Sequence, residues 1–260
     1  MKICTYNINS IKARLELLLG WLNKRENDID ILCLQELKTV TDDFPLQPFR
    51  KLGYKCEIIG QKAYNGVAVC SKPAPITSHQ GFGDEFWDKQ SRLISVKFPG
   101  FDIINIYAPH GGERKTEKWQ YKIDWYNRLI EHLKKIYSPD QPLILVGDFN
   151  VAHKDQDVYS PEFLHDSIGT MIEEREAFEE LLSLELVDVF RFLHPKEKIF
   201  TWWDYKGGAI WKNQGMRIDY ILCTKPLTVF LKECSVDLWP RKRRKPTPSD
   251  HAPLVSTWEF

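Results

Sequence analysis

The chain has 260 residues, and the 43% that are hydrophobic are enough to bury one large core. Its 36 lysines and arginines balance 36 aspartates and glutamates, so the zero formal net charge singles out no class of partner. The sequence lacks an apolar run near the ~18 residues of a membrane span, and its first residues lack the pattern of a signal peptide. We therefore expect one domain over residues 1–260 that does not associate with membranes.

Short apolar runs bounded by turn residues predict strands along the whole chain. In chain order they span residues 2–6, 29–35, 54–59, 66–71, 93–98, 103–107, 142–147, 200–203, 218–223 and 254–258. Apolar residues at helical spacing predict helices over residues 11–24, 118–137 and 172–184. Because strands outnumber helices and several follow one another directly, the order favours sheet packed on sheet with helices outside.

The cysteines give no sign of a metal site. Six are present without a Cys-x-x-Cys pair, and four of them lie in apolar runs, namely Cys4, Cys33, Cys70 and Cys223. Buried, reduced thiols of a cytosolic protein have this pattern. We therefore expect neither a zinc site nor a disulfide scaffold.

Polar side chains stand at the ends of many predicted strands, where scaffolds display their chemistry. They are Asn7, Asn9, Glu36, Tyr107, Asp148, Asn150, Asp250 and His251. Acids beside a buried strand are seldom buried unless they are paired or bound to metal. Three such acids with asparagine companions favour a hard divalent cation with oxygen ligands.

Asp219 has a different setting, because Ile218 and Tyr220 flank it inside an apolar run. A buried acid needs a partner, and His251 is the candidate. An aspartate holds an imidazole in one tautomer and stabilises its protonated form. Together with Mg²⁺, carboxylates and amides, this pair predicts hydrolysis of a phosphate ester.

Eight stretches resemble, in order, the exonuclease III family of apurinic/apyrimidinic (AP) endonucleases, within the endonuclease/exonuclease/phosphatase superfamily. They are TYNINSIKAR (5–14), DILCLQELK (30–38), YNGVAV (64–69), INIYAPHG (104–111), LVGDFNVAH (145–153), FTWWDY (200–205), GMRIDYIL (215–222) and PSDHAPL (248–254). The resemblance implies a four-layer α/β sandwich, with two face-to-face mixed β-sheets flanked by helices. It also implies a Mg²⁺-dependent DNA-repair nuclease that cuts 5′ to abasic sites in double-stranded DNA. Activity as a 3′-phosphodiesterase and 3′–5′ exonuclease, Mn²⁺ as a substitute, a monomer and a cytoplasmic, nucleoid-associated location are expected with it.

The resemblance assigns the metal ligands. Glu36 is expected to be the principal ligand, with Asn9 and Asp250 nearby. A second ion has the candidate ligands Asp148, Asn150 and His251, so one or two ions are expected.

The resemblance also assigns catalytic roles. Asn7 and Asn150 belong to the central hydrogen-bond network, and Asn150 contacts the scissile phosphate. Tyr107 positions that phosphate or stabilises developing charge. Asp148 activates water, while His251, oriented by Asp219, contacts a phosphate oxygen. An alternative makes His251 the base, and the sequence leaves this open.

The DNA contacts implied by the resemblance form two groups. Trp202, Met216 and Ile218 match an apolar pocket for a sugar without its base, and Met216 departs from the Trp or Leu that is common there. A flexible methionine favours a more permissive pocket. The phosphate and groove contacts are expected at Tyr64, Asn65, Arg92, His110 and Arg114.

Several charged residues are ambiguous. Lys38 lies just beyond the metal acid, and the basic run over residues 241–245 suits either phosphate contact or a solvated loop. Glu173, Glu174 and Glu176 are expected on the solvated side of a helix. Two alternative functions are hydrolysis of a phosphoinositide or sphingolipid headgroup, against which the apolar pocket argues, and non-catalytic DNA binding, against which the intact set of catalytic residues argues.

Overall fold

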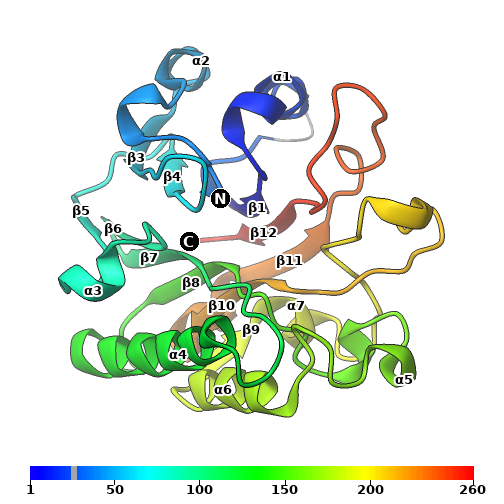
Figure 1. Ribbon diagram of the computed structural model, residues 1–260. Helices are drawn as coiled ribbons and strands as arrows, with labels where there is room; N and C mark the ends of the chain where they lie inside the picture. The colour runs from blue at the N-terminus through cyan, green and yellow to red at the C-terminus, as the bar shows by residue number, and fades with distance from the viewer. Residues whose placement is uncertain (25–27) are drawn as a thin grey trace.

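The structure is a computed structural model that describes residues 1–24 and 28–260. Two six-stranded sheets form its centre (Figure 1). The first has the order β11–β12–β1–β2–β4–β3, and the second β5–β6–β7–β8–β10–β9. Pairs β1–β2 and β7–β8 are parallel and their other neighbours are antiparallel, so both sheets are mixed, as expected.

The strands of the first sheet are β1 Lys2–Asn7, β2 Ile31–Gln35, β3 Lys55–Ile59, β4 Val67–Ser71, β11 Leu231–Val236 and β12 Leu254–Trp258. Those of the second are β5 Thr77–Gln80, β6 Leu93–Phe98, β7 Phe101–Tyr107, β8 Leu143–Asp148, β9 Leu186–Asp188 and β10 Asp219–Thr224. The α-helices are α1 Ile11–Leu22, α2 Leu46–Lys51, α3 Glu85–Asp88, α4 Glu117–Ile136, α5 Pro161–Leu164, α6 Ile172–Leu182 and α7 Val189–Leu193. Short 3-10 turns span Thr41–Asp43, Asp155–Asp157, Lys206–Gly208 and Lys225–Phe230.

Three apolar layers separate the sheets and helices. The central layer holds one face of each sheet, for example Ile3 of β1 against Ile103 and Val146 of the second sheet. The opposite faces carry neighbouring residues such as Ile104, which packs under Trp125 of α4. Helices α1 and α2 cover the first sheet, and α4 and α6 cover the second (Figure 1). The expected four-layer sandwich is therefore confirmed.

Burial on both faces explains the apolar runs that predicted the strands. In β7, residues 103–107 are all buried, since alternate side chains enter different apolar layers. One predicted strand is wrong. Residues 200–203 form only isolated bridges, from Trp202 to Met216 and to His251.

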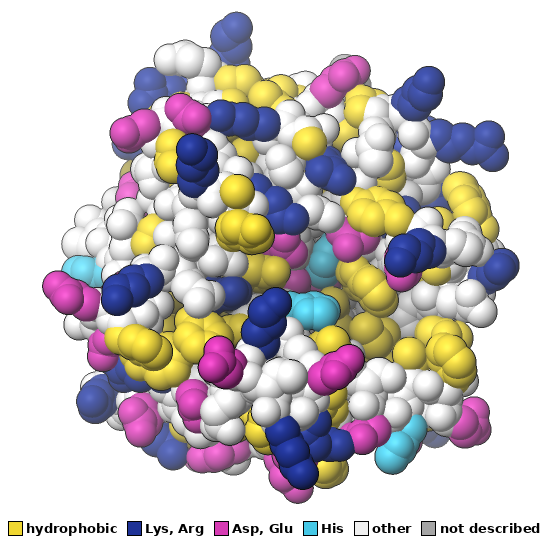
Figure 2. Space-filling model, in the orientation of Figure 1, with side chains coloured by type: hydrophobic (Ala, Val, Ile, Leu, Met, Phe, Trp, Pro, Cys, Tyr) yellow, Lys and Arg dark blue, Asp and Glu magenta, His cyan; other side chains and the backbone are white. Residues whose placement is uncertain are grey.

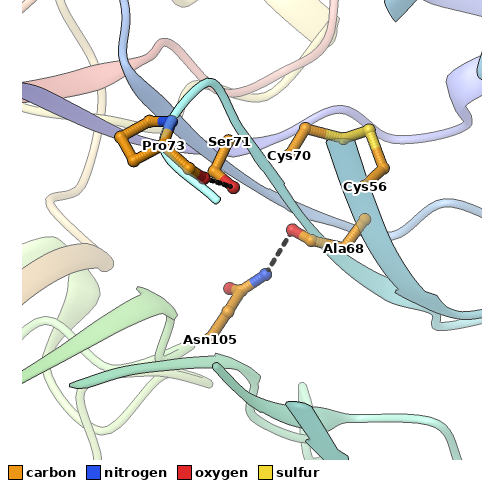
Figure 3. The surroundings of a disulfide bond; sticks show 6 residues. All are labelled: Cys56, Ala68, Cys70, Ser71, Pro73 and Asn105. Carbon is orange, nitrogen blue, oxygen red and sulfur yellow. Dashed lines mark hydrogen bonds between the residues drawn. A yellow bond between two sulfur atoms is a disulfide. The ribbon is translucent and has the colours of Figure 1, made fainter. Parts of the chain in front are cut away.

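The expectation of free thiols is also wrong for one pair. Cys56 of β3 and Cys70 of β4 are directly opposite in the antiparallel register and form a disulfide (Figure 3). Strand propensity does not give the register, so the sequence did not signal this proximity. The other four cysteines are free and buried.

Candidate active site

Five strands bring predicted polar residues to one edge of the sandwich. Asn7 ends β1, and Glu36 follows the parallel strand β2. In the second sheet, Tyr107 ends β7 and lies opposite Asp148, which ends the parallel strand β8. Asp148 also lies opposite Asp219, the first residue of β10. Both sheets therefore supply carboxylates to the same edge.

A cavity of about 760 Å³ opens at this edge. Its polar side includes Glu36, Tyr107, Asp148, Asn150, Asp250 and His251. Its other side includes an apolar wall made of Trp202, Met216 and Ile218. Figure 2 shows acidic and histidine side chains inside a hollow in the middle of the visible face, with apolar side chains around it.

Asn7 links the two sheets at this site. Its side-chain nitrogen donates to Glu36 Oε1 at 2.9 Å and to Asp148 Oδ2 at 2.8 Å. Its side-chain oxygen accepts from the backbone N–H of Asn9 at 3.0 Å. Because Asn7 is fully buried, water does not compete for these bonds. The amide therefore holds one carboxylate of each sheet in place.

Several functional candidates occupy left-handed backbone conformations. The φ angles are 46° at Asn9, 51° at Glu36, 53° at Lys38 and 53° at Asn150. This region is uncommon for residues other than glycine and costs on the order of 1–3 kcal/mol each. The surrounding hydrogen bonds must offset that cost, as the Asn7 contact does for Glu36.

The oxygens of Glu36 and Asn9 already converge on a cation. Lys38 Nζ lies 2.8 Å from Glu36 Oε2 and donates to Asn9 Oδ1 at 2.6 Å. Burial raises the pKa of Glu36, but the Lys38 ammonium and the Asn7 hydrogen bond outweigh it, and the pKa is lowered. Glu36, Asp148 and His251 each offer a ligand atom within 4.8 Å of the others. This donor set fits a divalent cation.

Asp250 lies beside these residues. It accepts from Asn9 Nδ2 at 2.9 Å and from Trp202 Nε1 at 3.0 Å. Burial raises its pKa, but nearby His251 and these hydrogen bonds lower it further. The carboxylate is therefore kept ionised and close to Asn9, one of the expected metal ligands.

His251 lies between two acids. Its Nδ1 is 2.8 Å from Asp219 Oδ2, and its Nε2 is 3.7 Å from Asp148 Oδ2. Burial lowers the pKa of His251, but the carboxylates of Asp219 and Asp148 outweigh burial and raise it to about 10. For Asp148, burial dominates and raises the pKa to about 7. The predicted Asp219–His251 pairing is thus present in the structure.

Tyr107 is held by Arg92. The Arg92 guanidinium stacks 4.9 Å from the centre of the Tyr107 ring, and Nη1 donates to the Tyr107 carbonyl oxygen at 3.1 Å. Burial and the neighbouring Glu36 carboxylate raise the Tyr107 pKa well above its usual range. The phenol therefore stays neutral and able to donate a hydrogen bond.

Asn150 is fixed by its neighbours. Its backbone N–H donates to Asp148 Oδ1, and its side-chain nitrogen donates to the Ala108 carbonyl, both at 2.9 Å. The loops after β7 and β8 are thereby tied together where they line the cavity.

Of the five expected phosphate and groove contacts, four line one hollow and the fifth does not. Tyr64, Asn65, Arg92 and His110 line an adjoining hollow. Tyr64 is 68% exposed, which suits a ligand contact. Arg114 instead contacts two acids: its guanidinium binds both oxygens of Asp166, and its Nη2 lies 2.8 Å from Glu173 Oε2.

The expectation that Glu174 faces solvent is wrong. Its side chain is fully buried and lies 2.6 Å from Lys122 Nζ of α4, which is buried too. Lys122 also donates to the carbonyl oxygens of Asn150 at 2.8 Å and His110 at 3.2 Å. Sequence pattern could not show this pair, because both residues resemble surface positions of charged helices.

Arg241, the first residue of the basic run, has neither of the two roles expected for that run. It is only 5% exposed, and it donates to the carbonyl oxygens of Asp250 at 3.1 Å and Trp203 at 2.9 Å. The first residue of the basic run is therefore structural, and it holds the segment that carries Asp250.

No described helix is both apolar enough and long enough for a bilayer crossing.

Comparisons with known proteins agree with this geometry. Residues 4–251 match the Endonuclease/Exonuclease/phosphatase family. The chain is 32% identical over 237 residues to an exodeoxyribonuclease of Bacillus subtilis, covering 91% of this chain and 93% of that protein. An AP endonuclease structure from Archaeoglobus fulgidus has a TM-score of 0.95 at 40% identity. The 3′ phosphatase NExo from Neisseria, bound to product DNA hairpin, has a TM-score of 0.93 at 37% identity. Both structures match over 100% of this chain and 100% of their own.

The family expected from the sequence motifs is confirmed by these matches, which extend over nearly the whole chain. The chain belongs to the endonuclease/exonuclease/phosphatase family, as a phosphodiester hydrolase of the exodeoxyribonuclease III and AP endonuclease type.

Proposed function

We propose that this enzyme cuts double-stranded DNA 5′ to an abasic site, leaving a 3′-hydroxyl and a 5′-deoxyribose phosphate. The observation that carries the proposal is the Asn7 bridge between Glu36 and Asp148, which lies in the same cavity as the apolar wall. A base-free sugar can leave the helix at the lowest cost, because its pairing and stacking are already lost. The exodeoxyribonuclease and 3′ phosphatase among its relatives support additional 3′–5′ exonuclease activity and removal of 3′ blocking groups.

The proposed cofactor is Mg²⁺, with Mn²⁺ as a substitute, because carboxylate and amide oxygens are hard ligands. Glu36, Asn9 and Asp250 would hold one ion. Asp148, Asn150 and His251 are the ligands proposed for a second, which would bind only where the His251 imidazole has lost its proton. A bound ion neutralises charge on the phosphate and lowers the pKa of bound water.

Asp148 is the better candidate for the general base. Its pKa of about 7 lies near the operating pH, where a base is both ionised and basic enough to accept a proton. The pKa of about 10 at His251 keeps its imidazole protonated. We therefore assign His251, oriented by Asp219, to donate a hydrogen bond to a phosphate oxygen, and Asp148 to accept the proton of the attacking water.

The remaining contacts with DNA are proposed from the positions of the side chains around the cavity. Asn150 and the neutral phenol of Tyr107 would donate to phosphate oxygens. Tyr64, Asn65, Arg92 and His110 would contact the DNA beside the cavity. Arg114 would contribute less, because its charge is already matched by two acids. In the apolar wall, Met216 gives a flexible surface that tolerates differences in the bound sugar.

The test is product mapping on three DNA duplexes, with an abasic site, a 3′-phosphate and an intact recessed 3′ end, each in Mg²⁺, Mn²⁺ or EDTA. We expect a single cut 5′ to the abasic site, ending in 3′-hydroxyl, with either metal and none in EDTA. Absence of nicking in both metals would contradict the proposal. The rates on the other two duplexes compare removal of a 3′-phosphate with 3′–5′ exonuclease activity.

A further inference from the structure

The catalytic cavity extends past the apolar wall into a second apolar region. We call this region the α5 lobe, and it consists of Tyr159, Phe163, Leu164, Ile168 and Ala209. Leu164 packs in one cluster with the wall residues Trp202 and Met216. The lobe is therefore continuous with the wall that the base-free sugar is proposed to contact.

An exposed phenyl ring forms part of this lobe. Phe163 is 75% exposed although it lines the cavity. Its ring lies against Tyr159, with centroids 6.4 Å apart. Tyr159 is in turn fixed, since its backbone N–H donates to the Gly215 carbonyl at 3.0 Å and its side chain packs against the apolar cluster that contains Phe200. Phe163 thus presents an aromatic surface to solvent from a supported position.

The size and charge of the cavity indicate what could occupy the lobe. A volume of about 760 Å³ lies within the range of ~300–1,000 Å³ that accepts drug-sized ligands, which is more than a lone sugar needs. Glu113, Asp204 and Lys206 also line the cavity, so opposite charges offset one another there, whereas the residues of the lobe itself carry no charge. A flat, neutral and aromatic occupant fits both facts.

We propose that the α5 lobe is a base-binding subsite in which Phe163 stacks on the base of a 3′-terminal nucleotide during exonuclease action. This inference rests on the proposed function. Aromatic stacking accepts any of the four bases, because every base has a π-face. It also offsets part of the cost of removing that nucleotide from the duplex stack. An abasic nucleotide has no base to place in the lobe, so its incision does not use Phe163.

The experiment compares kcat/KM for two substrates, an intact recessed 3′ end and an abasic duplex, in the wild type and three variants. Phe163→Ala should lower exonuclease activity about 5- to 150-fold, the range of one base–aromatic stack, and leave abasic incision unchanged. Phe163→Trp should keep exonuclease activity, because its ring still stacks. Phe192→Ala is the matched control, since Phe192 of α7 is 56% exposed and does not line the cavity.

An equal fall on both substrates in Phe163→Ala would show a general DNA contact and overturn the base subsite, as would unchanged exonuclease activity. Failure of the proposed function is a separate result, because the wild type itself would then not cut the abasic duplex. As a second measurement, a fluorescent base analogue at the 3′ end should be quenched on binding to the wild type and to Phe163→Trp. In Phe163→Ala it should stay bright, and equal quenching would contradict stacking.

Discussion

Asp219 shows how tightly the central residues depend on one another. Its Oδ2 binds His251, while its buried Oδ1 has no hydrogen-bond partner among the described residues. An unsatisfied buried carboxylate oxygen is costly, so the contact of Oδ2 with His251 is the interaction that offsets the burial of this side chain. Loss of either residue would leave the other charge uncompensated.

The raised pKa of His251 predicts how stability depends on pH in the metal-free protein. The folded value of about 10 exceeds an unfolded value of about 6.5. Its stabilisation is therefore complete below about pH 6.5 and is lost as pH rises through about 10. The raised pKa of Asp148 acts in the same direction, in a lower window between about 4 and about 7.

We expect the free energy of unfolding in EDTA to fall between about pH 7.5 and 10, with a slope on the order of 1 kcal/mol per pH unit. Urea denaturation at several pH values measures it. His251→Gln should be less stable at pH 7.5 and show a flatter dependence. An unchanged slope in that variant would mean that another group titrates in this window.

Helices α4 and α6 support the loops of the site from the outer face of the second sheet. Through Lys122 and Glu174 the two helices bind the carbonyl oxygens of His110 and Asn150 and the backbone N–H of Gly169, the last at 2.6 Å. Burial lowers the pKa of Lys122, and the Glu174 carboxylate opposes that shift. The helices thereby fix three loops that line the cavity.

Breaking this buried pair should be strongly destabilising. Lys122→Met leaves a fully buried carboxylate at Glu174 and should cost about 3–5 kcal/mol in the free energy of unfolding. The double change Lys122→Met with Glu174→Leu should recover part of that loss, because neither charge then remains buried. Denaturation curves of the three proteins test this.

Lys134→Ala is the control for that series. Lys134 lies 3.9 Å from Glu180 in the same pair of helices, but both side chains are more than half exposed, so about 0.5 kcal/mol or less is expected. Equal losses in Lys122→Met and Lys134→Ala would contradict a special role for the buried pair.

At the scale of the whole molecule, apolar patterning predicted most strands but not all. The pattern does not predict β5, β9 or β11. Strand β5 reads TSHQ and has no apolar residue, β9 has only three residues, and β11 reads LKECSV, in which polar residues interrupt the apolar ones. The aromatic segment 200–203 looked like a strand, yet it is a loop whose backbone pairs only locally. Propensity reports local preference, while pairing is decided by tertiary contacts.

The residues of the candidate site were easier to predict from the sequence than the buried charged residues that hold its loops in place. Motif residues such as Asn7, Glu36 and His251 are recognisable, because the chemistry requires those side chains at strand ends. Lys122, Glu174 and Arg241 gave no signal, because a charged residue in a helix or basic run looks the same whether it is exposed or buried. The α5 lobe depends on how a loop folds over the cavity, which periodicity does not describe.

The first and last strands of the structure pair with each other. We propose that residues 1–260 form one catalytic domain and that it acts as a monomer. Strand β1 lies between β12 and β2 in the first sheet, with Lys2 opposite Thr257. The first and last strands thus belong to the same sheet and share the central apolar layer. Removing either would open the layer on which the site rests.

The most direct test measures incision of an abasic duplex in Mg²⁺ by the wild type and by Glu36→Gln, with DNA binding measured in parallel. Glutamine keeps the size of the side chain and removes the charge proposed to hold the metal. We predict a cut 5′ to the abasic site by the wild type, and a rate lower by about 100-fold or more in the variant, which still binds the DNA. An intact duplex after incubation with the wild type, or equal rates for the two proteins, would contradict a metal-dependent nuclease centred on Glu36.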